Sequence, residues 1–144
     1  MVAETIKINA DILKAPDQYN SRTYPRLSCK LNLRFNILRT DPQSPNWLIS
    51  DGVEHSSITK DISAGGVCFA SGYSLPVGTI LNFRIHLEEK DRSIDCLAKV
   101  CRIEDDQFSA MFHLVAYYLD ISSADRVRID EFVRRELARQ GNKK

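Results

Sequence analysis

Two arginines separated by three residues form the first candidate binding site. In the segment Arg22-Thr23-Tyr24-Pro25-Arg26, the proline disfavours the helical conformation for the preceding tyrosine, so an extended or turning loop is expected. A guanidinium presents a planar fork of donors that fits phosphate and also the O6 and N7 acceptors of guanine. Both arginines on one short loop could therefore bind a ligand that carries both groups. Tyr24 either adds an aromatic face to this site or packs against the protein.

The second candidate site is the sequence Asp-Ile-Ser-Ala-Gly-Gly at residues 61–66. Asp61 and Ser63 are two positions apart, so in an extended segment their side chains point the same way. A carboxylate accepts hydrogen bonds from the N–H edge of guanine, and a serine hydroxyl donates or accepts beside it. Gly65 and Gly66 permit positive φ and close backbone approach. A serine or Asx turn between two strands needs the same residue types, so that interpretation stays open.

The charge of the chain is nearly balanced overall but uneven locally. A net charge of +1 on 144 residues argues against a protein that coats nucleic acid or an anionic membrane over its whole surface. Between residues 21 and 40, however, there are basic side chains and no acidic one, so an anion is the expected ligand there. Lys30, Arg34 and Arg39 are also explained by a solvated strand face. The basic residues of this stretch are Arg22, Arg26, Lys30, Arg34 and Arg39.

The cysteines and histidines do not have the spacing of a metal site. Cys96 and Cys101 lie five apart in a segment that alternates like a strand, which directs them to opposite faces, and structural zinc prefers closer pairs. We therefore predict ordinary thiols, no metal and no structural disulfide. No histidine neighbours a nucleophile, no phosphate-loop pattern occurs, and no carboxylate pair stands out, so no catalytic residue is assigned and an enzyme is not expected.

A period of two dominates the chain and predicts β-strands. The Asp51-Gly52 dipeptide predicts a hairpin between two of them. Strands at this spacing without intervening helices indicate an antiparallel sandwich or barrel, and a small barrel is favoured because one open sheet would leave exposed edges. The predicted strands are 27–38, 47–50, 53–59, 66–70, 81–87, 94–103 and 108–114.

The end of the chain changes to helical spacing. Ser122 followed by Asp125 is a capping pair and Gly141 a natural stop, so a helix over 122–140 is expected across the barrel or its mouth. Its apolar residues are Val127, Ile129, Phe132, Val133 and Leu137. Residues 1–20 are interpreted as an N-terminal arm, either mobile or with a short helix over 3–15, and residues 21–140 as the domain. No long apolar run or secretory pattern occurs, which favours a soluble, cytoplasmic protein.

The two candidate sites together resemble the PilZ domain, a bacterial receptor for cyclic di-GMP. The pattern of that family is an arginine, three residues and a second arginine, followed later by Asp or Asn, any residue, Ser, two residues and Gly. Here the positions are Arg22, Arg26, Asp61, Ser63 and Gly66. The resemblance implies a six-stranded antiparallel barrel with a C-terminal α-helix.

By this resemblance the arginines bind guanine and phosphate, Asp61 and Ser63 hold the other guanine, and Gly66 shapes the loop, with Tyr24 and Gly65 as additional site residues. No cofactor is implied besides the ligand cyclic di-GMP. Ligand binding would then switch the conformation of the arginine loop and regulate an unidentified protein partner in motility, pili or polysaccharide and biofilm pathways. Neither nucleic acid nor direct membrane insertion is expected.

Two other functions remain open. One is a protein adaptor of the same fold that does not bind nucleotide, although an adaptor has no need for both arginines. The other is an OB-like binder of single-stranded nucleic acid, which needs exposed aromatic side chains as stacking platforms. The phenylalanines of the predicted strands fall on inward-facing positions, which disfavours the second function. They are Phe35, Phe83, Phe108 and Phe112.

Overall fold

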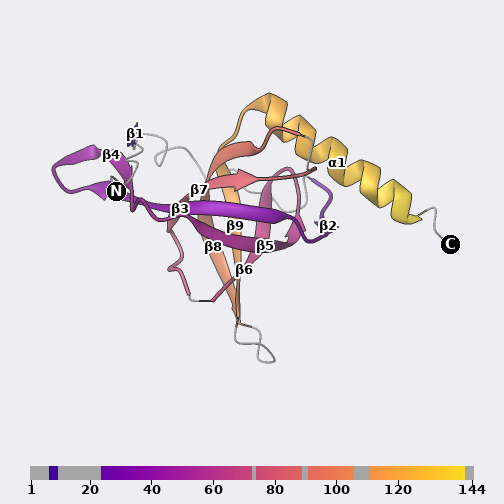
Figure 1. Cartoon of the computed structure of the whole chain (residues 1–144), viewed down its shortest axis with the longest axis horizontal. Helices are drawn as coiled ribbons and strands as arrows, with labels where there is room; N and C mark the ends of the chain where they lie inside the picture. The colour runs from indigo at the N-terminus through magenta and orange to yellow at the C-terminus, as the bar shows by residue number, and fades with distance from the viewer. Residues whose placement is uncertain (1–6, 10–23, 73, 89–90, 106–110, 142–144) are drawn as a thin grey trace.

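Six antiparallel strands close into a barrel at the centre of the molecule (Figure 1). They follow the order β3-β7-β8-β9-β6-β5, and pairing between β5 and β3 closes the ring. The computed structural model describes residues 7–9, 24–72, 74–88, 91–105 and 111–141. The strands are β3 (Asn32–Asp41), β5 (His55–Ile62), β6 (Gly66–Ser71), β7 (Ile80–Ile85), β8 (Ile94–Asp105) and β9 (Phe112–Asp120), and the C-terminal helix is α1 (Ser123–Gly141). The predicted six-stranded barrel with one C-terminal helix is confirmed.

Three shorter strands extend the sheet beyond the barrel: β1 (Lys7–Asn9), β2 (Leu27–Ser28) and β4 (Ser44–Ser50). One edge of β3 serves two partners, because residues 38–41 pair with β4 whereas residues 32–35 pair with β5. In turn, β1 pairs with β4, and β2 pairs with the end of β5. In Figure 1 the β3–β4 hairpin projects from one side of the barrel and α1 from the other.

The single strand predicted over 27–38 is interrupted between Cys29 and Leu31. Thr59 of β5 occupies the break, since its hydroxyl donates to the Cys29 carbonyl at 2.7 Å and accepts from the Leu31 amide at 2.9 Å. Side-chain hydrogen bonds thus replace part of the regular ladder. They leave β2 as a separate two-residue strand directly after Arg26.

The hairpin predicted at Asp51-Gly52 is wrong. The chain does turn there, with Gly52 at a φ of 75°. However, β4 pairs with β3 and β1, and β5 pairs with β3, β2 and β6. The Asp51 amide donates to the Ile37 carbonyl of β3 at 3.0 Å, so the turn leads the chain along the edge of β3. Local turn chemistry locates a turn but does not choose the partner of the next strand.

Alternation along the strands places one face of each in the core. Phe35, Phe69 and Phe83 meet there edge to face, with ring centroids 5.4–6.3 Å apart. Ile129 and Val133 of α1 belong to the same buried cluster, so burial against the strands holds the helix on the barrel. A smaller buried cluster of Leu38, Leu48, Ile80 and Leu97 lies under the β3–β4 extension.

The predicted helix over 122–140 is confirmed to within one residue at each end. Ser122 caps it, because the amide of Asp125 donates to the Ser122 hydroxyl at 3.1 Å. Val127 was grouped with the apolar face but is 53% exposed. The inward position of that first turn is instead filled by Asp125, which pairs with Arg128 at 3.1 Å.

The start of the chain contains one described element, β1, which adds to the edge of β4. A strand there differs from both interpretations of the arm, the short helix over 3–15 and a mobile segment. Residues 1–6 and 10–20 lie outside the described residues. None of the helices in the described part of the chain has the length and hydropathy needed to cross a bilayer.

Candidate functional site

A β-bulge at Lys60 directs the Asp61 side chain to the outside of the barrel. Thr59 pairs with Phe69 and Asp61 with Cys68, so Lys60 is an extra residue on β5. Thr59 and Ile62 point inward and are almost fully buried, at 2% and 0% exposure. The two residues between them, Lys60 and Asp61, therefore share the outer face. Without the bulge, alternation from Thr59 would turn Asp61 inward and Ile62 outward.

The short strand β2 brings Arg26 to Asp61. Ser28 is the register partner of Asp61 and Leu27 that of Ile62, so Arg26 lies just beyond the pairing. Its Nε is 3.7 Å from Asp61 Oδ1, with the two side chains 39% and 18% exposed. The structure thus joins one residue of each half of the sequence pattern. Arg22, the other predicted arginine, lies outside the described residues.

Partial burial gives Asp61 an unusual electrostatic setting. Desolvation raises the pKa of the Asp61 carboxyl, and the positive charges of Arg26 and Lys60 oppose this rise. A carboxylate that has lost part of its water gains more from a fitting donor than a fully solvated one does. The Asp61 carboxylate can therefore act as a strong hydrogen-bond acceptor for the N–H groups of a planar ring, with the Arg26 guanidinium beside it.

The Ser63 hydroxyl organises the loop that follows. It accepts from the amides of Gly65 at 3.1 Å and Gly66 at 3.3 Å, while the Ser63 amide donates to the Gly66 carbonyl at 2.9 Å. Ser63 is only 6% exposed. The serine turn left open by the sequence is therefore present. A ligand contact by Ser63 stays a prediction.

Tyr24 packs on this loop and links it to α1. A Cβ on Gly65 would lie 3.3 Å from Tyr24 Cδ2, so the absence of a side chain at Gly65 lets the ring approach. The Arg126 guanidinium lies 5.7 Å from the centre of the Tyr24 ring, and its Nη1 is 3.5 Å from the Tyr24 hydroxyl. Tyr24 thus packs against the protein, and a ligand contact by its ring stays a prediction. Arg126 was not foreseen, because nothing local in the sequence links it to the loop.

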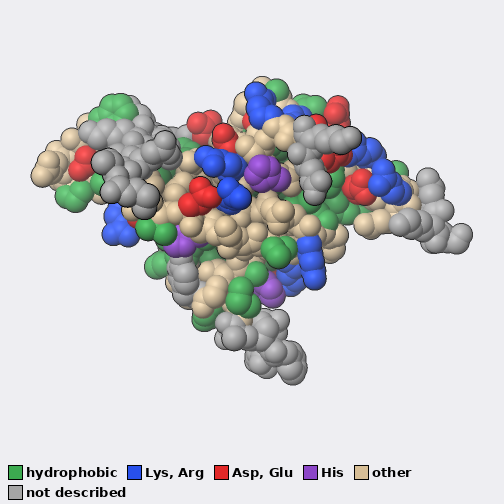
Figure 2. Space-filling model, in the orientation of Figure 1, with side chains coloured by type: hydrophobic (Ala, Val, Ile, Leu, Met, Phe, Trp, Pro, Cys, Tyr) green, Lys and Arg blue, Asp and Glu red, His purple; other side chains and the backbone are tan. Residues whose placement is uncertain are grey.

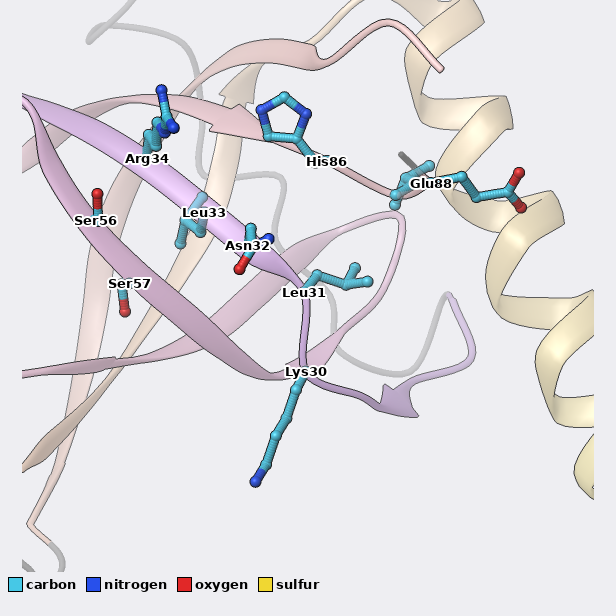
Figure 3. Close-up of a pocket in the computed structure, with 10 residues that line it drawn as sticks. Lys30, Leu31, Asn32, Leu33, Arg34, Ser56, Ser57, His86 and Glu88 are labelled. Carbon is cyan, nitrogen blue, oxygen red and sulfur yellow. The ribbon is translucent and has the colours of Figure 1, made fainter. Parts of the chain in front are cut away.

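Among the other described basic residues of the 21–40 stretch, Arg34 and Arg39 lie apart from Arg26. Arg34 pairs with Glu54 at 3.2 Å, and Arg39 lies on the β3–β4 extension opposite Ile49. Lys30 and Arg34 do line one depression, of about 580 Å³, but in Figure 3 their side chains extend in opposite directions. None of the pattern residues that the structure describes lines this depression. The solvated-face interpretation therefore holds for Arg34 and Arg39.

Another groove, of about 460 Å³, lies beside the described pattern residues. It includes Lys60 and Ser28, the register partner of Asp61, and among the described residues of its wall there are basic side chains but no acidic one. This size falls within the range of small-molecule sites. Over the whole face shown in Figure 2, basic and acidic side chains are mixed. The groove is lined by Ser28, Cys29, Lys30, Ile58, Thr59, Lys60, Ala70 and His113.

Metal and thiol chemistry receive no support from the described part of the chain. No group of three or more His, Cys, Asp or Glu side chains there is placed to hold a metal ion. All four cysteines are free thiols. Burial raises the pKa of Cys29 and of Cys68 to about 11, so both remain protonated at neutral pH.

The structure thus combines a closed six-stranded barrel, a C-terminal helix and an arginine held beside an Asp-x-Ser-x-x-Gly turn. The PilZ domain profile matches residues 20–135, and the chain belongs to the PilZ domain family. PilZ domains are generally receptor domains without catalytic activity.

Two solved structures are similar to this chain. The inhibitor of motility MotI/DgrA of Bacillus subtilis is 26% identical, with a TM-score of 0.66 over 87% of this chain and 54% of that one. This chain therefore spans about half the length of MotI/DgrA. The PilZ domain of YcgR from Escherichia coli, solved with c-di-GMP, is 14% identical, with a TM-score of 0.56 over 87% of this chain and all of that one. This second similarity concerns the fold. No curated protein matches the chain.

Proposed function

We propose that this protein is a cyclic di-GMP receptor that binds the nucleotide at Arg22, Arg26, Asp61, Ser63 and Gly66. The observation that carries the proposal is the 3.7 Å approach of Arg26 to Asp61, which unites the two halves of the family pattern on one outer face. The outward carboxylate supplies acceptors for one guanine, and the guanidinium supplies donors for phosphate or for the other guanine. Membership of the PilZ family supports the choice of ligand.

Calorimetric titration tests this proposal. We expect micromolar or tighter binding of cyclic di-GMP, and no comparable heat from GMP, GTP or cyclic di-AMP at the same concentrations. Cyclic di-AMP is the sharpest comparison because it carries the same two phosphates but lacks guanine O6 and N2. Equal affinity for both cyclic dinucleotides would show that the site recognises only phosphate. No binding of either one would favour the adaptor function.

We further propose that binding changes a surface presented to a protein partner in motility, pili or polysaccharide export. The similarity to MotI/DgrA, an inhibitor of motility, supports motility first. In this proposal residues 21–140 form the receptor domain and residues 1–20 an arm attached to its arginine loop. Hydrogen exchange tests the switch: ligand should protect amides 24–28 and 61–66, while those of β7 and of β8 up to residue 100 change little. Unchanged exchange at 24–28 would mean that the site is preformed.

Nucleic-acid binding is not supported by the described aromatic residues of the barrel. Phe35 and Phe83 are 3% and 1% exposed, and Phe112 packs against the core. Phe108 lies outside the described residues. A stacking platform for single-stranded nucleic acid needs ring faces open to solvent.

A further inference from the structure

A second bulge, on β8, aligns Arg102 with Asp61 across four strands. The register shifts between Val100 and Arg102, so that Arg102 pairs with Val115 of β9. Val115 pairs with Cys68 of β6, and Cys68 with Asp61 of β5. Arg102 and Asp61 therefore lie in the same row of the sheet. Val100 points inward, fully buried, whereas the Arg102 side chain is 58% exposed on the outer face.

Lys60 and Arg102 share one carboxylate, that of Glu104. Glu104 accepts from Arg102 Nη2 at 2.9 Å, and its other oxygen lies 3.9 Å from Lys60 Nζ. All three side chains are about half exposed, at 40–58%, so neither ion pair is strong and both cations can be withdrawn from Glu104 at low cost. Glu104 also acts on the site itself: after burial has raised the pKa of Asp61, Glu104 raises it further while Arg102 lowers it.

The net charge of the surface around Asp61 and Arg102 therefore depends on Glu104. Arg26, Lys60 and Arg102 bring three positive charges, which Asp61 and Glu104 largely offset. A cyclic dinucleotide that meets Arg26 and Asp61 through its bases brings two phosphates, which would seek cations close to these two residues. The exposed cations beside them are Lys60 and Arg102. The phosphates then compete with the Glu104 carboxylate for the same two cations.

We propose that Lys60 and Arg102 form a second anion-binding subsite for the ligand's phosphates, and that Glu104 is an internal competitor that lowers the affinity. This inference rests on the proposed function, because the ligand must first bind at Arg26 and Asp61. In the ligand-free protein Glu104 holds Lys60 and Arg102. In the complex the phosphates replace it, and the energy needed for this exchange sets the ligand concentration at which the receptor responds.

Neutralising Glu104 is the test, and the chain supplies a matched control. Glu54 is likewise shared by two cations, Arg34 at 3.2 Å and Arg84 at 3.8 Å, away from the pattern residues. We expect Glu104→Gln to tighten cyclic di-GMP binding by roughly three- to tenfold in calorimetric titration at low salt, and Glu54→Gln to change it less than about twofold. Arg102→Gln should weaken binding by a similar factor. The gain from Glu104→Gln should shrink in the Arg102→Gln background and as salt rises.

The possible results distinguish a failure of the proposed subsite from a failure of the proposed receptor function. If the wild type binds and Glu104→Gln leaves the affinity unchanged or matches Glu54→Gln, the subsite is refuted while the receptor function stands. If neither the wild type nor any variant binds, both proposals are refuted. Unfolding midpoints and circular dichroism of the variants confirm that each exchange at these exposed positions preserves the fold.

Discussion

Replacing Arg26 with alanine should weaken cyclic di-GMP binding by roughly ten- to a hundredfold. A hydrogen bond to a charged group contributes about 1.5–3 kcal/mol, and each 1.4 kcal/mol is a factor of ten in affinity. Arg26 is 39% exposed and 3.7 Å from Asp61, so it retains part of its water, and the lower half of this range is expected. Because Arg26 lowers the pKa of Asp61, its loss lets burial raise that pKa further. The defect should therefore grow as the pH falls.

The matched control is Arg39→Ala, which removes the same charge from the exposed β3–β4 extension. Calorimetric titration of both variants at neutral pH and near pH 5 is the assay, with the unfolding midpoint measured in parallel. Arg39→Ala should bind like the wild type. Both variants should retain stability to within about 1 kcal/mol, since an ion pair near the surface, such as Arg26–Asp61, contributes about 0–1 kcal/mol. Equal losses of affinity in the two variants would show that general positive charge, and not the Arg26–Asp61 pair, makes the site.

Three further predictions concern stability. Asp61→Asn should raise the unfolding midpoint at pH 7, because the raised pKa of Asp61 means that its ionised form destabilises the folded state. This gain in stability should disappear at acidic pH, where the wild-type carboxyl is protonated. A difference in midpoint that does not depend on pH would contradict this. Ser122→Ala should cost about 1 kcal/mol in chemical denaturation by removing the cap of α1, and an unchanged midpoint would disprove the capping role. Ile129→Ala should cost about 2–5 kcal/mol whereas Val127→Ala should cost less than about 0.5 kcal/mol, and similar losses in both would contradict the assigned helix face.

The barrel and its helix could be predicted because their signals are local and repeated. Alternation identified five of the six barrel strands, and the Ser122 cap indicated the start of α1. The strand predicted over 108–114 overlaps β9 (Phe112–Asp120) only at its end, because the buried residues 115–118 do not alternate between apolar and polar. Strand pairing was harder, since it depends on competition between distant segments. The turn at Asp51-Gly52 exists, yet β5 leaves β4 and pairs with β3. Thr59, whose hydroxyl divides the predicted 27–38 strand, gives no sequence signal of that role.

The candidate site was predictable only as a set of residue types. The contact between Arg26 and Asp61 depends on a bulge at Lys60 and on the two-residue strand β2. Neither feature produces a repeating pattern of apolar residues that could be recognised in the sequence. The packing of Arg126 on Tyr24 likewise joins residues from opposite ends of the domain. By contrast, the serine turn at 63–66 was among the interpretations weighed, because its residue types act on their own neighbours.

The order in which the chain is synthesised bears on when the receptor becomes competent. Both halves of the pattern lie within residues 22–66, so the ribosome releases them early. The loop at residues 63–66 gains its hydrogen bonds to β9 much later. The Gly65 carbonyl accepts from the amide of Tyr118 at 3.1 Å, and Gly66 pairs with Tyr117, and both tyrosines lie on β9. A nascent chain that stops before β9 therefore carries every pattern residue without the strand that fixes their loop. In the proposed receptor, cyclic di-GMP recognition would therefore begin only once β9 has left the ribosome, and unfinished chains would not compete for the second messenger.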